Sequence, residues 1–193
     1  LASRVAESRA DLGIAFDGDG DRVIMVDNRG EVVDGDELLY LMTRVRVEEN
    51  RLQGGVVGTL MTNYGLEIAL REMNVPFVRA DVGDRYVMAE LSSRGWHLGG
   101  ENSGHLLSLD LTTTGDAIIS ALQVIAAVAA LGGDLHELKS GMHKFPQIMI
   151  NVRADRMDAL DGSEAILAAV ADAEKVLGES GRVLLRKSGT EPV

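Results

Sequence analysis

Short hydrophobic runs alternate with longer amphipathic stretches along most of the chain. The runs are bounded by Gly, Pro, Asp and Asn, which is typical of strands, and the stretches repeat apolar residues at helical spacing. The pattern predicts helices over residues 2–9, 37–47, 63–73, 84–94 and 117–131, and strands over residues 12–16, 23–26, 31–33, 55–59 and 76–80. Because strands alternating with helices indicate βαβ units, we expect an α/β fold with a mixed, mainly parallel sheet flanked by helices.

A different unit is expected toward the C-terminal end of the chain. After residues 132–145, which read as a helix and then a linker, a strand–helix–strand pattern covers residues 147–153, 163–177 and 181–186. This pattern predicts the start of a smaller α+β domain. The most apolar stretch, residues 117–131, is too short to span a bilayer and predicts a buried helix.

Composition narrows the classes of partner. The 193 residues are 46% hydrophobic and 25% charged, which is ordinary for a globular protein. A net charge of −11 argues against binding to nucleic acid or anionic membranes, although a local basic pocket can still bind a small phosphorylated ligand. The absence of cysteine excludes disulfides and thiolate chemistry and is compatible with a cytoplasmic location.

The loop formed by residues 17–22 carries the clearest chemical signal. Asp17, Asp19 and Asp21 alternate with glycines directly after the predicted strand at residues 12–16. Glycines let the backbone curl, so three hard oxygen ligands can converge on one divalent cation, and Mg²⁺ is the cation we expect. A plain acidic turn is the alternative, but three gathered carboxylates repel one another without a cation.

A calcium-binding EF-hand fits the loop poorly. Such a loop starting at Asp17 needs Gly at its sixth position and Glu at its twelfth. Those positions hold Arg22 and Asn28, and no helical pattern leads into the loop. The sequence therefore excludes the EF-hand.

Three further segments, residues 100–105, 111–116 and 186–192, add to the chemical signal of the loop at residues 17–22. Residues 17–22 resemble the metal-binding loop of the α-D-phosphohexomutases, and residues 100–105, Gly-Glu-Asn-Ser-Gly-His, resemble the sugar-recognition loop of that family. Residues 186–192, Arg-Lys-Ser-Gly-Thr-Glu-Pro, resemble its phosphate-binding loop, and residues 111–116 resemble another family segment. These motifs stand in the family's order and the resemblance covers essentially the whole chain.

The resemblance implies roles for the motif residues. Mg²⁺ would be held by Asp17, Asp19 and Asp21, with a phosphate on a catalytic serine as the fourth ligand. A phosphosugar, the expected partner, would be bound by Glu101, Asn102 and Ser103. In the last loop Arg186 offers a bidentate fork for phosphate, Ser188 and Thr190 add hydroxyl donors, and Gly189 allows close approach of backbone amides.

The candidate catalytic residues each leave an alternative open. Arg22 either contacts the transferring phosphate or balances the neighbouring carboxylates. His105 is expected to contact substrate or transfer protons, because the ordinary pKa of histidine lies near neutrality. Arg85 either contacts phosphate or forms a salt bridge to Asp81 or Asp84. The remaining histidines, His97, His136 and His143, show no spacing typical of a metal site.

The family pattern also predicts the domain organisation. Residues 1–33 would end domain 2 and carry the metal loop, residues 34–140 would form the sugar-binding domain 3, and residues 141–193 would be a linker and a truncated, phosphate-binding domain 4. We expect an internal fragment whose phosphoserine lies upstream of Leu1, so the chain alone should be inactive. A homodimer of the full-length protein is left open.

The fine pattern of the loops resembles the family members that act on an amino sugar. It implies interconversion of glucosamine 6-phosphate and glucosamine 1-phosphate through a bisphosphorylated intermediate, for UDP-N-acetylglucosamine and peptidoglycan precursors. Two alternatives are a family member acting on glucose or mannose phosphate and a non-catalytic sugar-phosphate-binding fragment. A haloacid-dehalogenase-type phosphatase also uses aspartates and Mg²⁺, but it would leave the loops at residues 100–105 and 186–192 unexplained.

Overall fold

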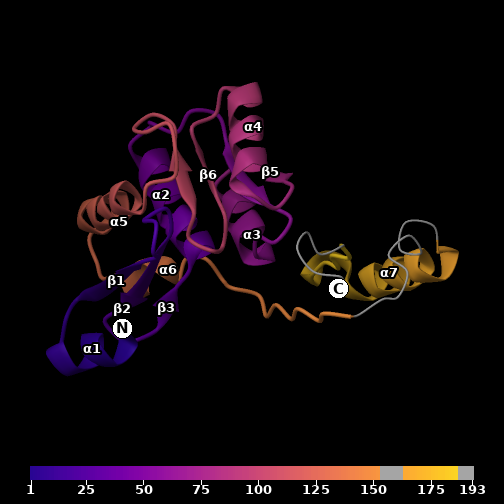
Figure 1. Cartoon of the computed structure of the whole chain (residues 1–193), viewed down its shortest axis with the longest axis horizontal. Coiled ribbons are helices and arrows are strands. Elements are labelled where there is room, and N and C mark those ends of the chain that lie inside the picture. The colour runs from indigo at the N-terminus through magenta and orange to yellow at the C-terminus, as the bar shows by residue number, and fades with distance from the viewer. Residues whose placement is uncertain (153–162, 187–193) are drawn as a thin grey trace. The chain divides into compact units, whose positions relative to one another are not determined.

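The computed structural model describes residues 1–152 and 163–186. Its contacts divide the chain into two compact units, Leu1–Lys144 and Phe145–Val193 (Figure 1). The predicted finer boundary at residue 33 stays a prediction.

The first unit begins with a small antiparallel sheet. Helix α1 (Ala2–Ser8) precedes β1 (Leu12–Phe16), β2 (Val23–Asp27) and β3 (Val32–Val33), which pair in the order β1-β2-β3. Strands β2 and β3 form an antiparallel hairpin. The pairing of Phe16 with Val23 shows that β1 and β2 also form a hairpin, so residues 17–22 are its loop. The loop therefore follows a strand of an antiparallel sheet.

The second sheet of this unit is the mixed one that the alternation predicts. Strands β4 (Val56–Thr59), β5 (Phe77–Ala80), β6 (Leu98–Gly100) and β7 (Leu106–Ser108) lie in the order β5-β4-β6-β7. The central strand β4 runs parallel to β5 and β6, and only β7 is antiparallel. Helices α3 (Tyr64–Glu72) and α4 (Asp84–Arg94) make the connections between the parallel strands. The α/β class is therefore confirmed.

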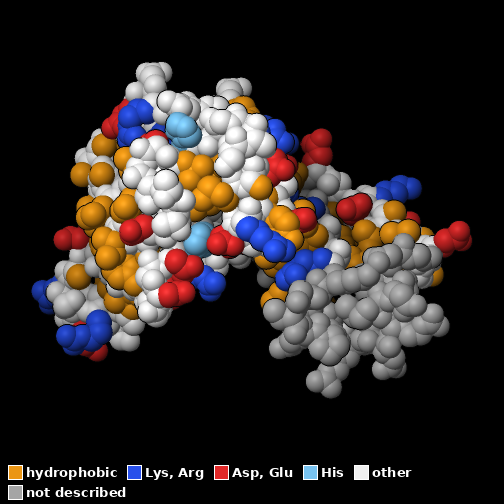
Figure 2. All heavy atoms as spheres, turned by 45° about the horizontal axis from the view of Figure 1, so that its top comes forward, with side chains coloured by type: hydrophobic (Ala, Val, Ile, Leu, Met, Phe, Trp, Pro, Cys, Tyr) orange, Lys and Arg blue, Asp and Glu red, His pale blue; other side chains and the backbone are white. Residues whose placement is uncertain are grey.

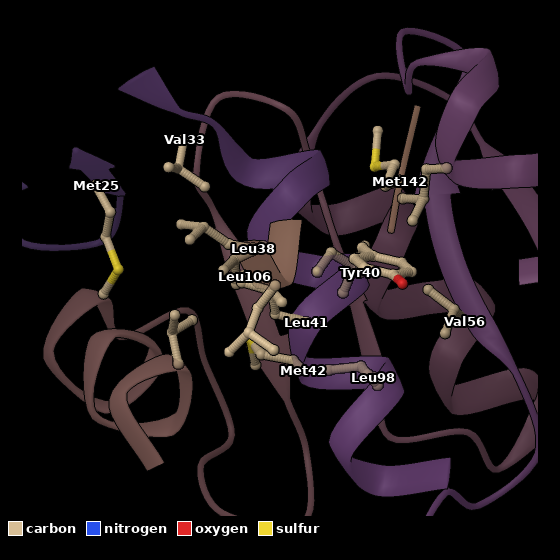
Figure 3. Close-up of a cluster of buried hydrophobic side chains, with 14 of the residues drawn as sticks. Met25, Val33, Leu38, Tyr40, Leu41, Met42, Val56, Leu98, Leu106 and Met142 are labelled. Atoms are coloured by element: carbon tan, nitrogen blue, oxygen red, sulfur yellow. The ribbon is translucent and has the colours of Figure 1, made fainter. Parts of the chain in front are cut away.

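Both sheets share one hydrophobic core built around α2 (Gly35–Glu48). The helix starts with a capping box, in which Asp34 accepts from the Glu37 N–H group and Glu37 accepts from the Asp34 N–H group. Its buried side chains, among them Leu38 and Leu41, contact residues of both sheets (Figure 3). The hairpin sheet contributes Val23, Met25 and Val33, and the mixed sheet contributes Val56, Leu98 and Leu106.

Helix α5 (Ala117–Leu131) is half-buried rather than buried as its apolar sequence predicted. Small residues such as Ala121 and Val124 face the core, while Ile118, Leu122 and Ile125 are exposed. Figure 2 shows hydrophobic side chains gathered on the side of the molecule where α5 lies in Figure 1. A uniformly apolar helix carries no polar face in its sequence, so periodicity could not reveal that only one face is covered.

The short helix α6 (Leu135–Lys139) completes the first unit. In the second unit, α7 (Glu164–Leu177) confirms the predicted helix and leads into the 3₁₀ turn Gly178–Ser180. The strands predicted over residues 147–153 and 181–186 are wrong for the residues that are described, 147–152 and 181–186, which form no strand. Strands persist only where a partner completes their hydrogen bonds, and hydrophobic pattern alone cannot supply one. Within the described ranges, no helix is long and apolar enough to cross a membrane.

Candidate functional site

The loop at residues 17–22 is organised around one carboxylate. Asp17 Oδ1 accepts hydrogen bonds from the backbone N–H groups of Gly20 at 3.1 Å, Asp21 at 3.2 Å and Arg22 at 3.2 Å. Desolvation acts to raise the pKa of Asp17, but the Arg22 N–H group, hydrogen bonding with the Asp21 and Asp19 side chains and the Asp21 N–H group together outweigh it, and the pKa lies below its usual value. Asp17 therefore stays ionised and fixes the curvature of the loop.

The three predicted metal ligands are brought together. One carboxylate oxygen from each of Asp17, Asp19 and Asp21 lies within 4.8 Å of the others. Asp21 Oδ1 is buried and has no hydrogen-bond partner among the described residues. A buried acceptor that lacks a donor is costly, and a hard cation would satisfy it. The donor set of three carboxylates therefore fits Mg²⁺.

The loop is attached to the predicted sugar loop by backbone contacts. The Val23 N–H group donates to Gly104 O at 3.1 Å, and Arg22 pairs with His105 in an isolated antiparallel bridge. Gly104 has φ +92°, and a Cβ there would lie 2.1 Å from Val23 O. Only glycine allows this approach, which explains its place in the Gly-Glu-Asn-Ser-Gly-His motif.

His105 connects the two loops through its side chain. The imidazole is buried, and its Nδ1 lies 3.1 Å from Asp21 Oδ2. Gly115 packs directly against the ring, since a Cβ at that position would approach the ring atoms to 2.4 Å. A histidine held in this way orients the Asp21 carboxylate. The predicted contact of His105 with substrate stays a prediction.

Arg22 lies beside the acidic loop on the exposed surface. Its Nε is 3.9 Å from both Asp17 Oδ2 and Asp21 Oδ1. These distances are at the limit of an ion pair, so the guanidinium neutralises the loop only weakly. The geometry is compatible with both expected roles, charge balance and phosphate contact.

The sugar loop is fixed on both sides while its tip is exposed. Glu101 Oε1 accepts from the Gly83 N–H group at 3.0 Å, and Asn102 O accepts from the Gly35 N–H group at 3.1 Å. Ser103, at the tip, is exposed. The loop thus presents short polar side chains on a fixed backbone, as hydrogen bonding to a sugar requires.

Arg85 follows the Gly83 turn, close in sequence to the contact with Glu101. Its guanidinium lies 4.5 Å from the centre of the Tyr86 ring and donates to the Tyr86 hydroxyl at 2.5 Å. Among the described residues, no ion pair joins Arg85 to Asp81 or Asp84, so the salt-bridge alternative is wrong. A phosphate contact by Arg85 stays a prediction.

Almost all of the predicted phosphate loop lies outside the described residues. Arg186 is described and its side chain is exposed. Ser188, Gly189 and Thr190 lie outside the described residues. Their role in binding phosphate stays a prediction.

The structure also gathers a second acidic group that the sequence did not indicate. His136 Nδ1 lies 2.9 Å from Asp27 Oδ2, and Glu31 completes a group with metal-ligand spacing. However, Lys139 Nζ lies 3.0 Å from Asp27 and 2.9 Å from Glu31. The ammonium already supplies the cation, so this group holds α6 against the β2–β3 hairpin. His136 lies 105 or more positions from Glu31 and Asp27 in the sequence, so local spacing cannot reveal such a group.

Comparison with known proteins supports the resemblance that the motifs indicated. The family model described as phosphoglucomutase/phosphomannomutase, alpha/beta/alpha domain III, matches residues 34–145, and the model of the C-terminal domain of that family matches residues 149–193. A phosphoglucosamine mutase of Hahella chejuensis is 61% identical over 193 residues, which are 100% of this chain and 43% of the relative. A phosphoglucosamine mutase of Escherichia coli O7:K1 is 56% identical, with 100% and 44% covered.

A solved structure agrees in fold. The Aspergillus fumigatus N-acetylphosphoglucosamine mutase in complex with GlcNAc-6P and magnesium has a TM-score of 0.77 at 20% identity, covering 98% of this chain and 50% of that one. This chain spans less than half the length of the two curated relatives. Since the domain III model alone matches more than half of the 193 residues, the chain belongs to the phosphoglucomutase/phosphomannomutase family, the α-D-phosphohexomutases.

Proposed function

We propose that the full-length protein is a phosphoglucosamine mutase, which interconverts glucosamine 6-phosphate and glucosamine 1-phosphate. The observation that carries the proposal is the connection of the metal loop to the sugar loop by the contact of His105 with Asp21. This contact joins a loop of carboxylates suited to a cation to a loop suited to a sugar, and so it supports the proposal. Relatives that are 61% and 56% identical bear the name of this enzyme and support the amino-sugar substrate.

Mg²⁺ would be held by Asp17, Asp19 and Asp21. When bound, it neutralises the negative charge of a phosphoryl group in transfer. Asp17 fixes the loop through three backbone N–H groups, while His105 holds Asp21 in place. Arg22 lies at the surface of the same loop and would contact the phosphoryl oxygens.

The sugar would be bound by Glu101, Asn102 and Ser103. The Gly83 N–H group fixes one oxygen of Glu101, and the other has no protein partner within the described residues. A carboxylate accepts from hydroxyl groups and pairs with an ammonium, so this residue suits glucosamine better than glucose. Arg85 and the loop with Arg186, Ser188, Gly189 and Thr190 would contact the phosphate groups.

The proposed organisation follows the family. Residues 1–33 would end domain 2, residues 34–140 would form domain 3, and residues 141–193 would include the linker and part of domain 4. No serine in this chain stands in a motif resembling the family's phosphoserine loop. We therefore expect the 193 residues alone to give no turnover, and measurable turnover by them would contradict this expectation.

The test compares turnover of glucosamine 6-phosphate and glucose 6-phosphate by the full-length protein with Mg²⁺. A strong preference for the amino sugar supports the proposal, and Glu101→Gln should then reduce that preference. A preference for glucose 6-phosphate would keep the mechanism and overturn the substrate. If a folded protein that binds Mg²⁺ turns over neither compound, it is a non-catalytic sugar-phosphate-binding protein.

A further inference from the structure

The first turn of α2 contacts two loops that are far apart in the sequence. The Gly35 N–H group donates to Asn102 O at 3.1 Å, in the sugar loop. The carboxylate of the next residue, Asp36, accepts from the Asn63 N–H group at 2.8 Å through Oδ2. One helical turn therefore holds the Glu101–Gly104 loop and the Leu60–Asn63 loop together.

Asp36 is an unusual residue for this position. It is 1% exposed, and its Oδ1 has no hydrogen-bond partner among the described residues. Burial is the main cause that raises its pKa, to about 7, although the Asn63 N–H group acts in the opposite direction. A buried carboxyl that is half satisfied costs stability, so its presence calls for a role that an apolar residue could not fill.

The Leu60–Asn63 loop is held more firmly than a simple connection requires. Arg79 Nη1 donates to Thr59 O at 2.9 Å and to Thr62 O at 2.8 Å. The hydroxyl of Thr62 also accepts from the Thr59 N–H group at 2.9 Å. Together with Asp36, these contacts fix the backbone of the whole loop.

Both loops follow strands that are neighbours in the sheet. The Leu60–Asn63 loop follows β4, the Glu101–Gly104 loop follows β6, and β4 and β6 are parallel. The carboxyl ends of parallel strands on either side of a reversal in strand order form the usual ligand crevice. The reversal occurs here, since the chain passes from β4 to β5 on one side and then to β6 on the other.

We propose that Asp36 is a positioning residue for sugar-phosphate binding, because it fixes the Leu60–Asn63 loop to the helical turn that supports the Glu101–Gly104 loop. This inference rests on the proposed mutase function. Asp36 would touch no substrate and would act through the two loops. The charged groups facing it are Asp34 on the same helix end, Arg79 from β5 and Lys144 after α6.

The test measures kcat and KM for glucosamine 6-phosphate in the full-length protein with Mg²⁺. Asp36→Ala removes the acceptor of the Asn63 N–H group, and we expect KM to rise about tenfold with kcat little changed. Asp36→Asn keeps an acceptor oxygen and should hold KM within about twofold of wild type. Thr43→Ala is the matched control, since Thr43 is another buried polar residue of α2 that bonds only within the helix, to Leu39 O.

Amide hydrogen exchange supplies a readout that does not depend on turnover. In Asp36→Ala, the protection of amide hydrogens should fall in both loops, residues 60–63 and residues 101–104. Thr43→Ala should leave the protection of residues 101–104 unchanged. If Asp36→Ala does not fold, Asp36→Leu, which fills the same space without an acceptor, takes its place. Wild-type KM and wild-type exchange in both loops would overturn the proposal.

The two proposals fail in different ways. If the wild-type protein turns over neither sugar phosphate, the mutase function is wrong, and the coupling of the loops is then decided by exchange alone. If the wild-type protein turns over glucosamine 6-phosphate but Asp36→Ala keeps the wild-type KM and the wild-type exchange in both loops, the function stands and the positioning role is wrong.

Discussion

Replacing Asp36 by Asn should change how the stability of the Leu1–Lys144 unit depends on pH. The side chain is 1% exposed at the start of α2, and its pKa is raised to about 7, mainly by burial, from 3.8. The Asn63 N–H group, Lys144 and Arg79 favour the ionised form but do not outweigh burial. Asparagine keeps an acceptor for Asn63 and cannot ionise.

The direction and size of the effect follow from proton linkage. Between pH 4 and pH 7 the folded protein retains a proton on Asp36 that the unfolded chain has lost. The wild-type free energy of unfolding therefore falls as the pH rises through this range, and the loss is complete above pH 7. A shift of about 3 pKa units corresponds to roughly 4 kcal/mol as an upper value, because each unit is worth about 1.36 kcal/mol. Relative to wild type, Asp36→Asn should thus gain stability by up to roughly 4 kcal/mol between pH 4 and pH 8.

Urea unfolding of the 193-residue chain, followed by tryptophan fluorescence, measures this difference. Trp96 is the single tryptophan and lies in the Leu1–Lys144 unit, so the signal reports on that unit. Asp11→Asn, which removes an exposed carboxylate from the same unit, is the control for the loss of one negative charge. A stability difference between Asp36→Asn and wild type that stays constant from pH 4 to pH 8 would refute the reasoning.

Three further changes test the site and its support. Asp21→Asn should weaken Mg²⁺ binding at least about tenfold in isothermal titration of the chain, and unchanged affinity would remove Asp21 from the metal site. Gly115→Ala should lower turnover of the full-length protein by up to about 100-fold, because its Cβ displaces the His105 ring; unchanged turnover would mean that this ring position is unimportant. Asp27→Asn should cost about 3–5 kcal/mol of unfolding free energy at neutral pH, since Lys139 loses a buried partner. The pKa of Asp27 is lowered to about 2, as its hydrogen bonds outweigh burial, so the destabilisation should be smaller at pH 2 than at pH 7.

Local pattern was enough to predict most elements of the first unit. The alternation of apolar runs with amphipathic stretches gave the strands and helices from residue 2 to residue 94. The pairing of β1 with β2 was missed because the six residues between them resemble a ligand loop and not a hairpin turn. Strand pairing depends on partners, and hydrophobic pattern does not identify them.

The part of the site whose residues are close together in the sequence was predictable. The alternation of Asp17, Asp19 and Asp21 predicts convergence of carboxylates within one loop, and the structure brings them together. The group of Asp27, Glu31 and His136 was not predictable, because α6 meets the β2–β3 hairpin only through tertiary packing. The same limit hid Asp36, whose partner Asn63 lies on another element.

The metal loop and the sugar loop belong to different sheets, yet they depend on one core. The hairpin sheet carries the metal loop and contributes Val23 and Met25 to the buried cluster, to which the mixed sheet adds Leu98 and Leu106, the residues that flank the sugar loop. Proteins are packed closely enough that a change in such a core moves the elements on both sides of it. The His105 contact with Asp21 and the Val23 bond to Gly104 then transmit any shift directly between the loops. The affinities for a divalent cation and for a sugar phosphate should therefore change together when this core is altered, although no core residue touches either ligand.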